Sequence, residues 1–339
     1  KKFEDSIANY TGAKYVVAIV NGSCALQLAL EVCGIKPGDE VLLPSLTFVA
    51  TANAVTHCGA HPHFVDSDKD NLAISSTFLK EYLLKISEMT GGVCINKYTK
   101  KPIRGLLPMH VFGHPADLDK LLEIAHDFNL ILIEDAAEAL GSFYYGKHVG
   151  TFGTAGVLSF NGNKIITTGG GGAILTDDKD LAFKAKHLST NAKLAHNWDY
   201  IHDEIGYNYR MPNINAALGF AQMEDLEKLI ISKRKLYYAY EKMLSSFHDV
   251  NLIKEPFGCK SNYWLQAIKL KNGDMSLRNS ILKAMNNAGY MARPVWSLLH
   301  KFKQFEKFPR SSIKTAEILE REIINIPSSS NILDYKNVN

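Results

Sequence analysis

Short apolar runs alternate with helical spacings of apolar residues from Asn21 to about Asp177. The runs are bounded by polar, glycine or proline residues, as is typical of buried strands. Strands are therefore expected at 40–43, 63–65, 105–110, 130–133, 156–160 and 172–175. Helices are expected between them, at 23–33, in a segment that ends near 55, and at 117–128. Such alternation implies right-handed crossovers and a mostly parallel sheet covered by helices, which is an α/β fold.

A different pattern begins near residue 213. Apolar residues recur at helical spacing from 213 to 245 and predict one long helix. Beyond it we expect a strand at 261–270 and helices at 276–287 and 315–323. A chain of 339 residues is long enough for two domains. We therefore place a large domain at 1–229 and a smaller C-terminal α/β domain at 230–339.

The composition narrows the class of protein. A hydrophobic content of 46% and a charged content of 22% describe an ordinary globular protein. The net charge of +3, without a basic run, argues against a nucleic-acid binder. No apolar stretch is long enough to span a bilayer, and the first five residues lack the apolar core of a signal peptide. The five cysteines are scattered without metal-ligand spacing, so we expect free thiols, no metal site and a cytoplasmic location.

Lys164 is the most informative residue in the chain. It lies between two apolar runs and among small, polar and glycine neighbours, from Ser159 to Gly172. Upstream, the predicted strand 130–133 leads into the carboxylate of Asp135. This pair suits pyridoxal phosphate, whose aldehyde forms a Schiff base with a lysine and whose pyridine nitrogen is kept protonated by a carboxylate. Either residue alone is explained more simply, by a surface lysine in a glycine-rich hairpin and by a strand-end cap, so the surrounding residues decide.

Further residues supply the other parts of such a site. The turn at Gly22, Ser23 and Cys24 begins a predicted helix, where free N–H groups favour a phosphate, and the Ser159 hydroxyl can reach the same phosphate. A plain N-cap is the commoner explanation of that turn alone.

Two side chains suit the cofactor ring. Phe48 follows a strand and Pro44 and can stack on a flat ring, although core packing is the simpler role for a lone phenylalanine. Glu138, three residues after Asp135, can reach the ring hydroxyl, although it is also explained as a helix-start carboxylate.

Five motifs in register resemble the sugar-nucleotide aminotransferases of the DegT/StrS type, over nearly the whole chain. They are Gly22-Ser23-Cys24-Ala25-Leu26, Pro44-Ser45-Leu46-Thr47-Phe48, Glu134-Asp135-Ala136-Ala137-Glu138, Ser159-Phe160-Asn161-Gly162-Asn163-Lys164 and Gly206-Tyr207-Asn208-Tyr209-Arg210-Met211. The resemblance implies the aspartate-aminotransferase fold (type I), with pyridoxal 5'-phosphate as cofactor in the large domain.

The resemblance also implies an assembly. Members of this family form homodimers with active sites at the interface, and Asn208 matches a residue that reaches the phosphate of the neighbouring subunit. Members usually carry a further N-terminal segment that helps to shape the substrate site, so this chain is expected to start late.

Within that family, the chain resembles the branch that makes precursors of bacillosamine and legionaminic acid. The signals are the stretches 93–97, 108–115, 196–213 and 293–296. They imply a UDP-linked 4-keto-6-deoxy N-acetylhexosamine as substrate, with Arg293 and Tyr209 in substrate binding. A guanidinium suits a phosphate, but a surface arginine explains Arg293 equally well. Cys24 and Glu138 depart from the family, which more often has small residues at the first position and glutamine or histidine at the second.

The implied reaction is a ping-pong transamination in amino-sugar biosynthesis. Glutamate leaves its amino group on the cofactor and departs as 2-oxoglutarate, and the keto sugar then receives the group and becomes a 4-amino sugar. Lys164 serves as covalent tether and as general acid/base. One rival is a sugar dehydratase, in whose relatives a histidine replaces the lysine; other lyases stay open. The other rival is a non-catalytic regulator, against which Lys164, Asp135 and Ser159 argue.

Overall fold

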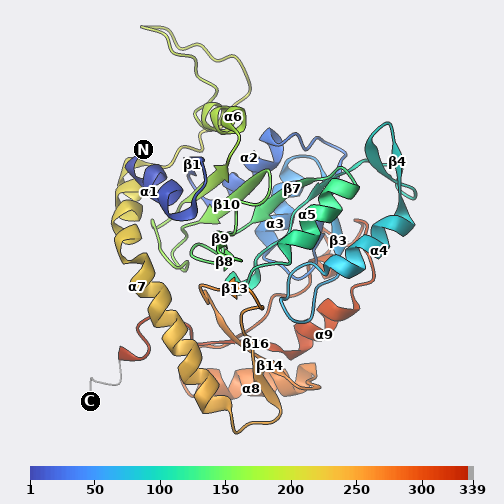
Figure 1. Ribbon diagram of the computed structural model, residues 1–339, viewed down its shortest axis with the longest axis vertical. Coiled ribbons are helices and arrows are strands. Elements are labelled where there is room, and N and C mark those ends of the chain that lie inside the picture. The colour runs from blue at the N-terminus through green and yellow to red at the C-terminus, as the bar shows by residue number, and fades with distance from the viewer. Residues whose placement is uncertain (335–339) are drawn as a thin grey trace.

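A seven-stranded sheet lies at the centre of the computed structural model, which describes residues 1–334 (Figure 1). Its order is β1-β11-β10-β7-β6-β2-β3, and only β11 runs antiparallel to its neighbours, β1 and β10. The strands are β1 (Tyr15–Ile19), β2 (Glu40–Pro44), β3 (His61–Val65), β6 (Ile103–Leu106), β7 (Ile131–Asp135), β10 (Ala155–Ser159) and β11 (Gly172–Thr176). The expected mostly parallel sheet is confirmed.

Both faces of this sheet are buried, which explains why its strands read as nearly continuous apolar runs. Successive side chains of a strand point to opposite faces. In β10, Val157 therefore packs with α2, α3 and α6, whereas Leu158 packs with α1 and α7. At the β3 side of that second face, α4 and α5 cover Leu42 and Leu132. The helices are α1 (Lys2–Thr11), α2 (Gly22–Val32), α3 (Val49–His57), α4 (Ser76–Ile86), α5 (Leu118–Asp127) and α6 (Lys179–Ser189).

The long helix α7 (Asn213–Leu244) runs along one edge of the molecule, from α1 to a second sheet (Figure 1). That sheet is antiparallel, in the order β12-β14-β16-β15, with β12 (Val250–Leu252), β14 (Gln266–Leu270), β15 (Arg293–Pro294) and β16 (Ile323–Ile326). Helices α8 (Met275–Asn287) and α9 (Lys314–Glu322) pack against it. The expected domain boundary at 229/230 falls inside α7 and stays a prediction, and residues 335–339 of the second domain lie outside the described part.

Short elements complete the chain. The strands β4 (Ser87–Thr90) and β5 (Val93–Asn96) form a hairpin, and β8 (Phe143–Tyr144) pairs with β9 (Lys147–His148) and with β13 (Cys259–Lys260). Two 3₁₀ turns are η1 (Val111–Gly113) and η2 (Leu299–Lys301). Within residues 1–334, no helix combines the length and the apolarity that crossing a bilayer requires.

Expected and observed ends differ by one or more residues for most elements, and three of these differences are instructive. The strand expected at 105–110 stops at Leu106, because Pro108 has no N–H to continue the ladder, although Met109 still pairs with Asp135 of β7. The strand expected at 261–270 begins only at Gln266. The side chains of Ser261 and Asn262 donate instead to the carbonyls of Gly113 and Glu138, which belong to the large domain. The last helix ends at Glu322, and its expected final residue starts β16.

Candidate active site

A pocket of ≈ 310 Å³ lies where β7 and β10 end beside the start of α2. Ligands of parallel sheets bind at the carboxyl ends of their strands, so this place agrees with the general rule. The predicted residues that line it are Gly22, Ser23, Phe48, Asp135, Glu138, Ser159 and Lys164. The structure thus brings together side chains that are far apart in sequence.

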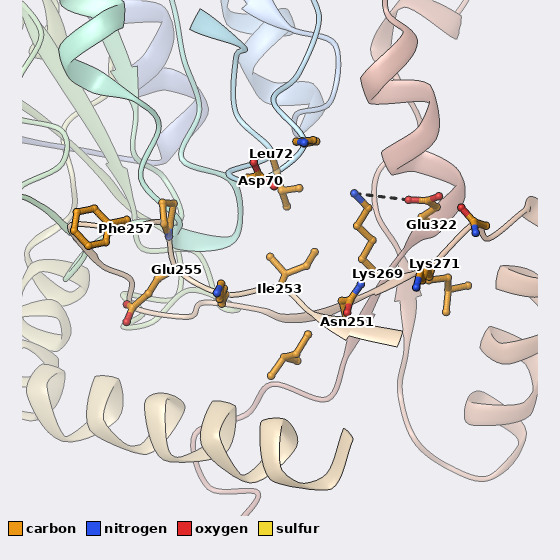
Figure 2. Close-up of a pocket in the computed structure, with 15 residues that line it drawn as sticks. Asp70, Leu72, Asn251, Ile253, Glu255, Phe257, Lys269, Lys271 and Glu322 are labelled. Carbon is orange, nitrogen blue, oxygen red and sulfur yellow. Dashed lines mark ion pairs between the residues drawn. The ribbon is translucent and has the colours of Figure 1, made fainter. Parts of the chain in front are cut away.

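A larger hollow of ≈ 580 Å³ lies elsewhere, between the loop that carries Asp70 and Leu72 and the strands of the second sheet (Figure 2). Its ion pair joins Lys269 and Glu322 at 3.8 Å. None of the residues predicted from the sequence to bind or react lies in this hollow. Size alone therefore does not identify the site, and the chemistry favours the smaller pocket.

The first turn of α2 forms one end of the pocket. Asn21 caps the helix, and its Oδ1 accepts the N–H of Cys24 at 2.8 Å. The N–H groups of Gly22 and Ser23 have no partner within the helix, because no carbonyl precedes the first turn of a helix at the right spacing to accept them. Ser159 lies so close that a Cβ on Gly22 would come within 2.9 Å of its Cβ. Glycine therefore lets the helix start meet a serine hydroxyl, which is an arrangement that suits a phosphate group.

Asp135 lies at the buried end of β7 and is 2% exposed. The Thr51 hydroxyl donates to its Oδ2 at 2.7 Å, and the N–H of Ala137 donates to its Oδ1 at 3.2 Å. Burial raises the pKa of Asp135 above its usual range, although these two donors favour the charged form. The carboxylate is thus held in place and would be stabilised by a cationic group bound in the pocket.

Lys164 and Glu138 form a buried ion pair. The Lys164 Nζ lies 3.5 Å from the Glu138 Oε1, and the two side chains are 11% and 1% exposed. The N–H of Phe112 donates to the other carboxylate oxygen of Glu138 at 3.0 Å. Burial raises the pKa of Glu138 to about 7, although the Lys164 ammonium and the Phe112 N–H oppose the shift. Lys164 itself lies in a turn in which its N–H donates to the Asn161 carbonyl at 3.0 Å.

Three aromatic side chains border the pocket. Phe48 precedes α3 and is 49% exposed, which leaves its ring free to cover a flat ligand. Trp296 packs on Phe112, with the ring centroids 5.2 Å apart. Trp264 lies beneath the Lys164 ammonium, 3.9 Å from Nζ to the ring centroid. The position of Phe48 agrees with the stacking role predicted for it, which stays a prediction.

Four predicted site residues do not line this pocket. Cys24 donates its N–H to the Oδ1 of Asn21 at 2.8 Å and does not line the pocket. Tyr209 stacks on Tyr207, at 4.7 Å between ring centroids, and its hydroxyl donates to Gln27 on α2. Asn208 and Arg293 are exposed, the first beside Thr190 and the second on the short strand β15. The roles predicted for these residues stay predictions.

Among the pocket and supporting residues that were not predicted from the sequence, three have side chains that contact predicted site residues or their neighbours. Thr51 lies inside α3, only three residues after Phe48, and its hydroxyl is one of several polar groups in that helix, so no local signal singled it out. Trp296 lies in the stretch 293–296, from which only Arg293 was predicted to bind substrate. Trp264 comes from a region about 100 residues after Lys164 in sequence, and no local pattern connects the two.

Replacing Glu138 by Gln is expected to change how stability depends on pH in the cofactor-free protein. Since the pKa of Glu138 is raised to about 7 in the folded chain, the protonated carboxyl contributes stability that is full below the unfolded value of 4.5 and is lost as pH rises through 7. A glutamine has no such proton to lose. The free energy of unfolding of Glu138→Gln minus that of wild type should therefore increase by on the order of 2 kcal/mol from pH 4.5 to pH 7.5. Urea unfolding across this range measures the difference, and parallel profiles would contradict the proposed titration.

The donors of this pocket fit pyridoxal phosphate. The α2 start and Ser159 suit its phosphate, the buried carboxylate of Asp135 suits its pyridine nitrogen, and the amine of Lys164 suits its aldehyde. Phe48 provides an exposed ring at the rim. No cluster of metal ligands lies among these residues; within the described chain, one group of potential ligands exists, His187, Asp203 and Glu204, and it is not part of the pocket.

Comparisons with known proteins agree with this geometry. Residues 1–337 match the family model described as the DegT/DnrJ/EryC1/StrS aminotransferase family. A GDP-perosamine synthase of Escherichia coli O157:H7 is 38% identical over 331 residues, which cover 97% of this chain and 84% of that protein. A GDP-perosamine synthase of Caulobacter vibrioides is 35% identical over 336 residues, 98% of this chain and 85% of that protein. A solved DegT DnrJ EryC1 StrS aminotransferase from Brucella abortus has a TM-score of 0.87 and 27% identity, covering 97% of this chain and 84% of that one.

Proposed function

The chain belongs to the DegT/DnrJ/EryC1/StrS aminotransferase family, and from this premise we propose that it transfers the amino group of glutamate to C4 of a nucleotide-linked 4-keto-6-deoxy sugar. The protein is a pyridoxal phosphate-dependent sugar aminotransferase. Its two sheets form the type I fold of these enzymes, as the resemblance implied. The donor, the sugar and the roles of single residues are the proposal.

The observation that carries the proposal is the meeting of Lys164, Asp135 and Glu138 in one buried pocket. When bound, the cofactor acts as an electron sink that lets an amino group pass between two carbon skeletons. Lys164 holds the cofactor covalently, and its released amine then moves a proton at the carbon that carries the amino group. Asp135 favours a positive charge on the ring nitrogen, and Thr51 keeps that carboxylate oriented.

Glu138 and the α2 start complete the arrangement. The Glu138 carboxylate lies 3.5 Å from the Lys164 ammonium, and we assign it the ring hydroxyl of the bound cofactor. The N–H groups of Gly22 and Ser23, with the Ser159 hydroxyl, anchor the phosphate. A lysine at position 164 argues against the dehydratase alternative, in whose relatives a histidine replaces it.

Two nucleotide sugars are candidates for the acceptor. The stretches 196–213 and 293–296 resemble the branch that uses a UDP-linked N-acetylhexosamine. The two curated relatives described above are named GDP-perosamine synthases, and they match almost the whole chain. The second observation extends over many more residues than the first, so we place the GDP-linked keto sugar first and the UDP-linked N-acetyl sugar second.

A panel of 4-keto sugar nucleotides decides between them. With glutamate as donor, the GDP-linked 4-keto-6-deoxy sugar should turn over at least about tenfold faster, in kcat/KM, than the UDP-linked N-acetyl sugar, since mismatched polar groups in a site cost 1–3 kcal/mol. Formation of 2-oxoglutarate and of the amino sugar is measured for each. Faster turnover of the UDP-linked sugar would restore the branch predicted from the sequence, and no turnover of any member would contradict the sugar substrate.

We also propose a homodimer with shared active sites. Asn208 is exposed in the single chain, outside the pocket, as expected of a side chain that serves a neighbouring subunit. Chains with Lys164→Ala and chains with Asn208→Ala should each be nearly inactive, whereas a mixture should form some dimers with one intact site. Recovery of up to about a quarter of wild-type activity on mixing is expected, from random pairing of the two chains. Subunit exchange without any recovery would contradict sharing.

A further inference from the structure

Trp264 connects the C-terminal half of the chain to Lys164. Its ring lies under the ammonium, with 3.9 Å from Lys164 Nζ to the ring centroid. Its indole N–H donates to the carbonyl of Asn163, the residue before Lys164, at 2.7 Å. The side chain is therefore in contact with both ends of the lysine, the amine and the backbone turn that carries it. Trp264 is 6% exposed, so water does not weaken these contacts.

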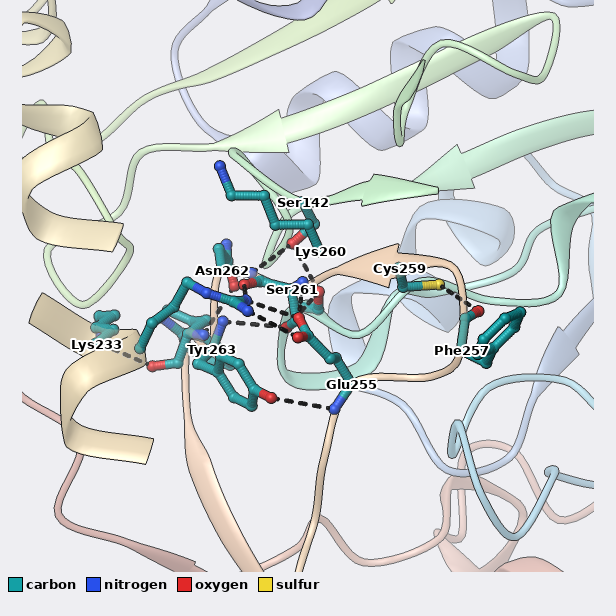
Figure 3. A network of polar contacts seen from close by, with 12 residues as sticks. Ser142, Lys233, Glu255, Phe257, Cys259, Lys260, Ser261, Asn262 and Tyr263 are labelled. Carbon is teal, nitrogen blue, oxygen red and sulfur yellow. Dashed lines mark hydrogen bonds and ion pairs between the residues drawn. The ribbon is translucent and has the colours of Figure 1, made fainter. Parts of the chain in front are cut away.

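The backbone of Trp264 is held on both sides. Its N–H donates to the Asn262 Oδ1 at 2.8 Å, and its carbonyl accepts from the Lys233 Nζ at 2.9 Å. Lys233 is itself buried on α7 and also donates to the Ser328 carbonyl at 2.7 Å. Figure 3 shows this polar network around Lys233, Ser261 and Asn262. The backbone that carries the Trp264 ring is thus held by bonds to residues outside the pocket.

Asn262 links the tryptophan to the other neighbour of the lysine. Its amide group donates to the carbonyl of Glu138 at 2.8 Å and to that of Leu140 at 2.9 Å, and its side chain is fully buried. One side chain therefore sets the position of Trp264 and of the turn that carries Glu138. The Lys164 amine lies between the two.

The ring and the carboxylate do different things to an amine. Asp135 and Glu138 are the charged groups that face Lys164, and its ammonium opposes the rise that burial causes in the pKa of both carboxyls. An indole face attracts the ammonium through its quadrupole but cannot accept a proton. A released lysine that must hand its proton to a substrate carbon is better served by such a support than by a second carboxylate.

We propose that Trp264 is a positioning residue for the catalytic amine, which holds the free Lys164 ammonium over its ring and fixes the Lys164 turn through Asn163. The inference rests on the proposed role of Lys164. It adds a residue from beyond α7 to a site whose motif residues all come before α7 in the chain.

Competitive acetylation of the cofactor-free protein tests the contact directly. Acetic anhydride reacts only with the uncharged amine, and peptide mass spectrometry gives a rate for each lysine. Lys147 is the internal reference, because its ammonium lies 4.4 Å from the centroid of the Phe152 ring and outside the pocket. Relative to Lys147, acetylation of Lys164 should be about tenfold faster in Trp264→Leu and less than about threefold faster in Trp264→Phe, which keeps a ring.

Fluorinated tryptophans at position 264 test the ring charge without removing the side chain that packs there. Site-specific replacement of Trp264 by tryptophans with increasing ring fluorination keeps the shape and the N–H while it weakens the charge of the ring face. Acetylation of Lys164 should rise stepwise along this series. Equal rates for the leucine and phenylalanine variants, or a flat fluorination series, would overturn the proposal.

Binding of the cofactor separates this inference from the proposed function. If Trp264 acts through Lys164, then Trp264→Phe should leave the Kd for pyridoxal phosphate within about twofold in the Lys164→Ala background, where the two residues no longer interact. An equal loss of affinity in both backgrounds would show that Trp264 acts on the pocket itself. A different result would contradict the proposed function, namely attachment of the cofactor to another lysine. The acetylation rates are measured without cofactor and do not depend on that result.

Discussion

Lys164→Ala should lower turnover with glutamate and a keto sugar nucleotide by about 10⁴-fold or more, because one side chain supplies both the covalent attachment and the proton transfer, and proton transfer alone contributes up to about 10⁴-fold. The cofactor should still bind, without a covalent bond, since Gly22, Ser23, Ser159 and Asp135 are untouched. Its absorbance band should differ from that of wild type. Coupled detection of 2-oxoglutarate measures turnover.

The matched control is Lys147→Ala. Lys147 also lies over an aromatic ring, that of Phe152, but outside the pocket. Its replacement should leave turnover near the wild-type value. Removing a single general base usually costs at least about 100-fold in rate. If Lys164→Ala kept more than about one hundredth of wild-type turnover, the assignment of Lys164 would therefore be wrong.

Asp135→Asn should lower kcat by about 10²- to 10³-fold, the usual cost of removing one preorganised electrostatic group. The amide keeps the shape of the carboxylate and can still accept from Thr51 and Ala137, so the folded structure should persist. The free energy of unfolding of the cofactor-free protein should therefore change by less than about 1 kcal/mol. Loss of activity without loss of stability is the result that a role at the ring nitrogen predicts.

The neighbouring carboxylate provides the contrast. Glu134 is fully buried on the other face of the same strand, where it accepts from His110 Nε2 at 3.1 Å and from the N–H groups of Gly150, Phe152 and Gly153. Glu134→Gln puts an amide among these donors and should cost about 3 kcal/mol of stability. Chemical unfolding and steady-state kinetics on both variants separate the two roles. Near-normal turnover in Asp135→Asn would contradict the account.

The central sheet was predictable, except for its edge strand β1, because its strands are buried on both faces. A strand such as β10 needs apolar residues at nearly every position, which makes a run that stands out in the sequence. Helices α1, α4 and α6 were missed, and two of them, α1 and α6, for the opposite reason. They bury only a few residues each, Phe3, Ile7 and Thr11 in one and Ala182, Ala185, Leu188 and Ser189 in the other, and polar residues fill the rest.

The site was predictable as far as its residues lie at strand and helix ends. Asp135, Ser159 and Gly22 follow or precede strong local patterns, and parallel strands bring their ends together. Thr51 and Trp264 have no such local signal. Trp264 reaches Lys164 through a segment that was expected to continue a strand, and its position depends on buried polar bonds of Asn262 that only the folded chain reveals.

Borohydride reduction of the wild-type protein loaded with pyridoxal phosphate tests the central claim most directly. Reduction fixes the cofactor on the lysine that holds it, and peptide mass spectrometry then identifies that lysine. The account predicts the modified residue in the peptide that contains Ser159-Phe160-Asn161-Gly162-Asn163-Lys164, with loss of the label when glutamate is added before reduction. A label on any other lysine, or a label on Lys164 that glutamate does not reduce, would contradict it.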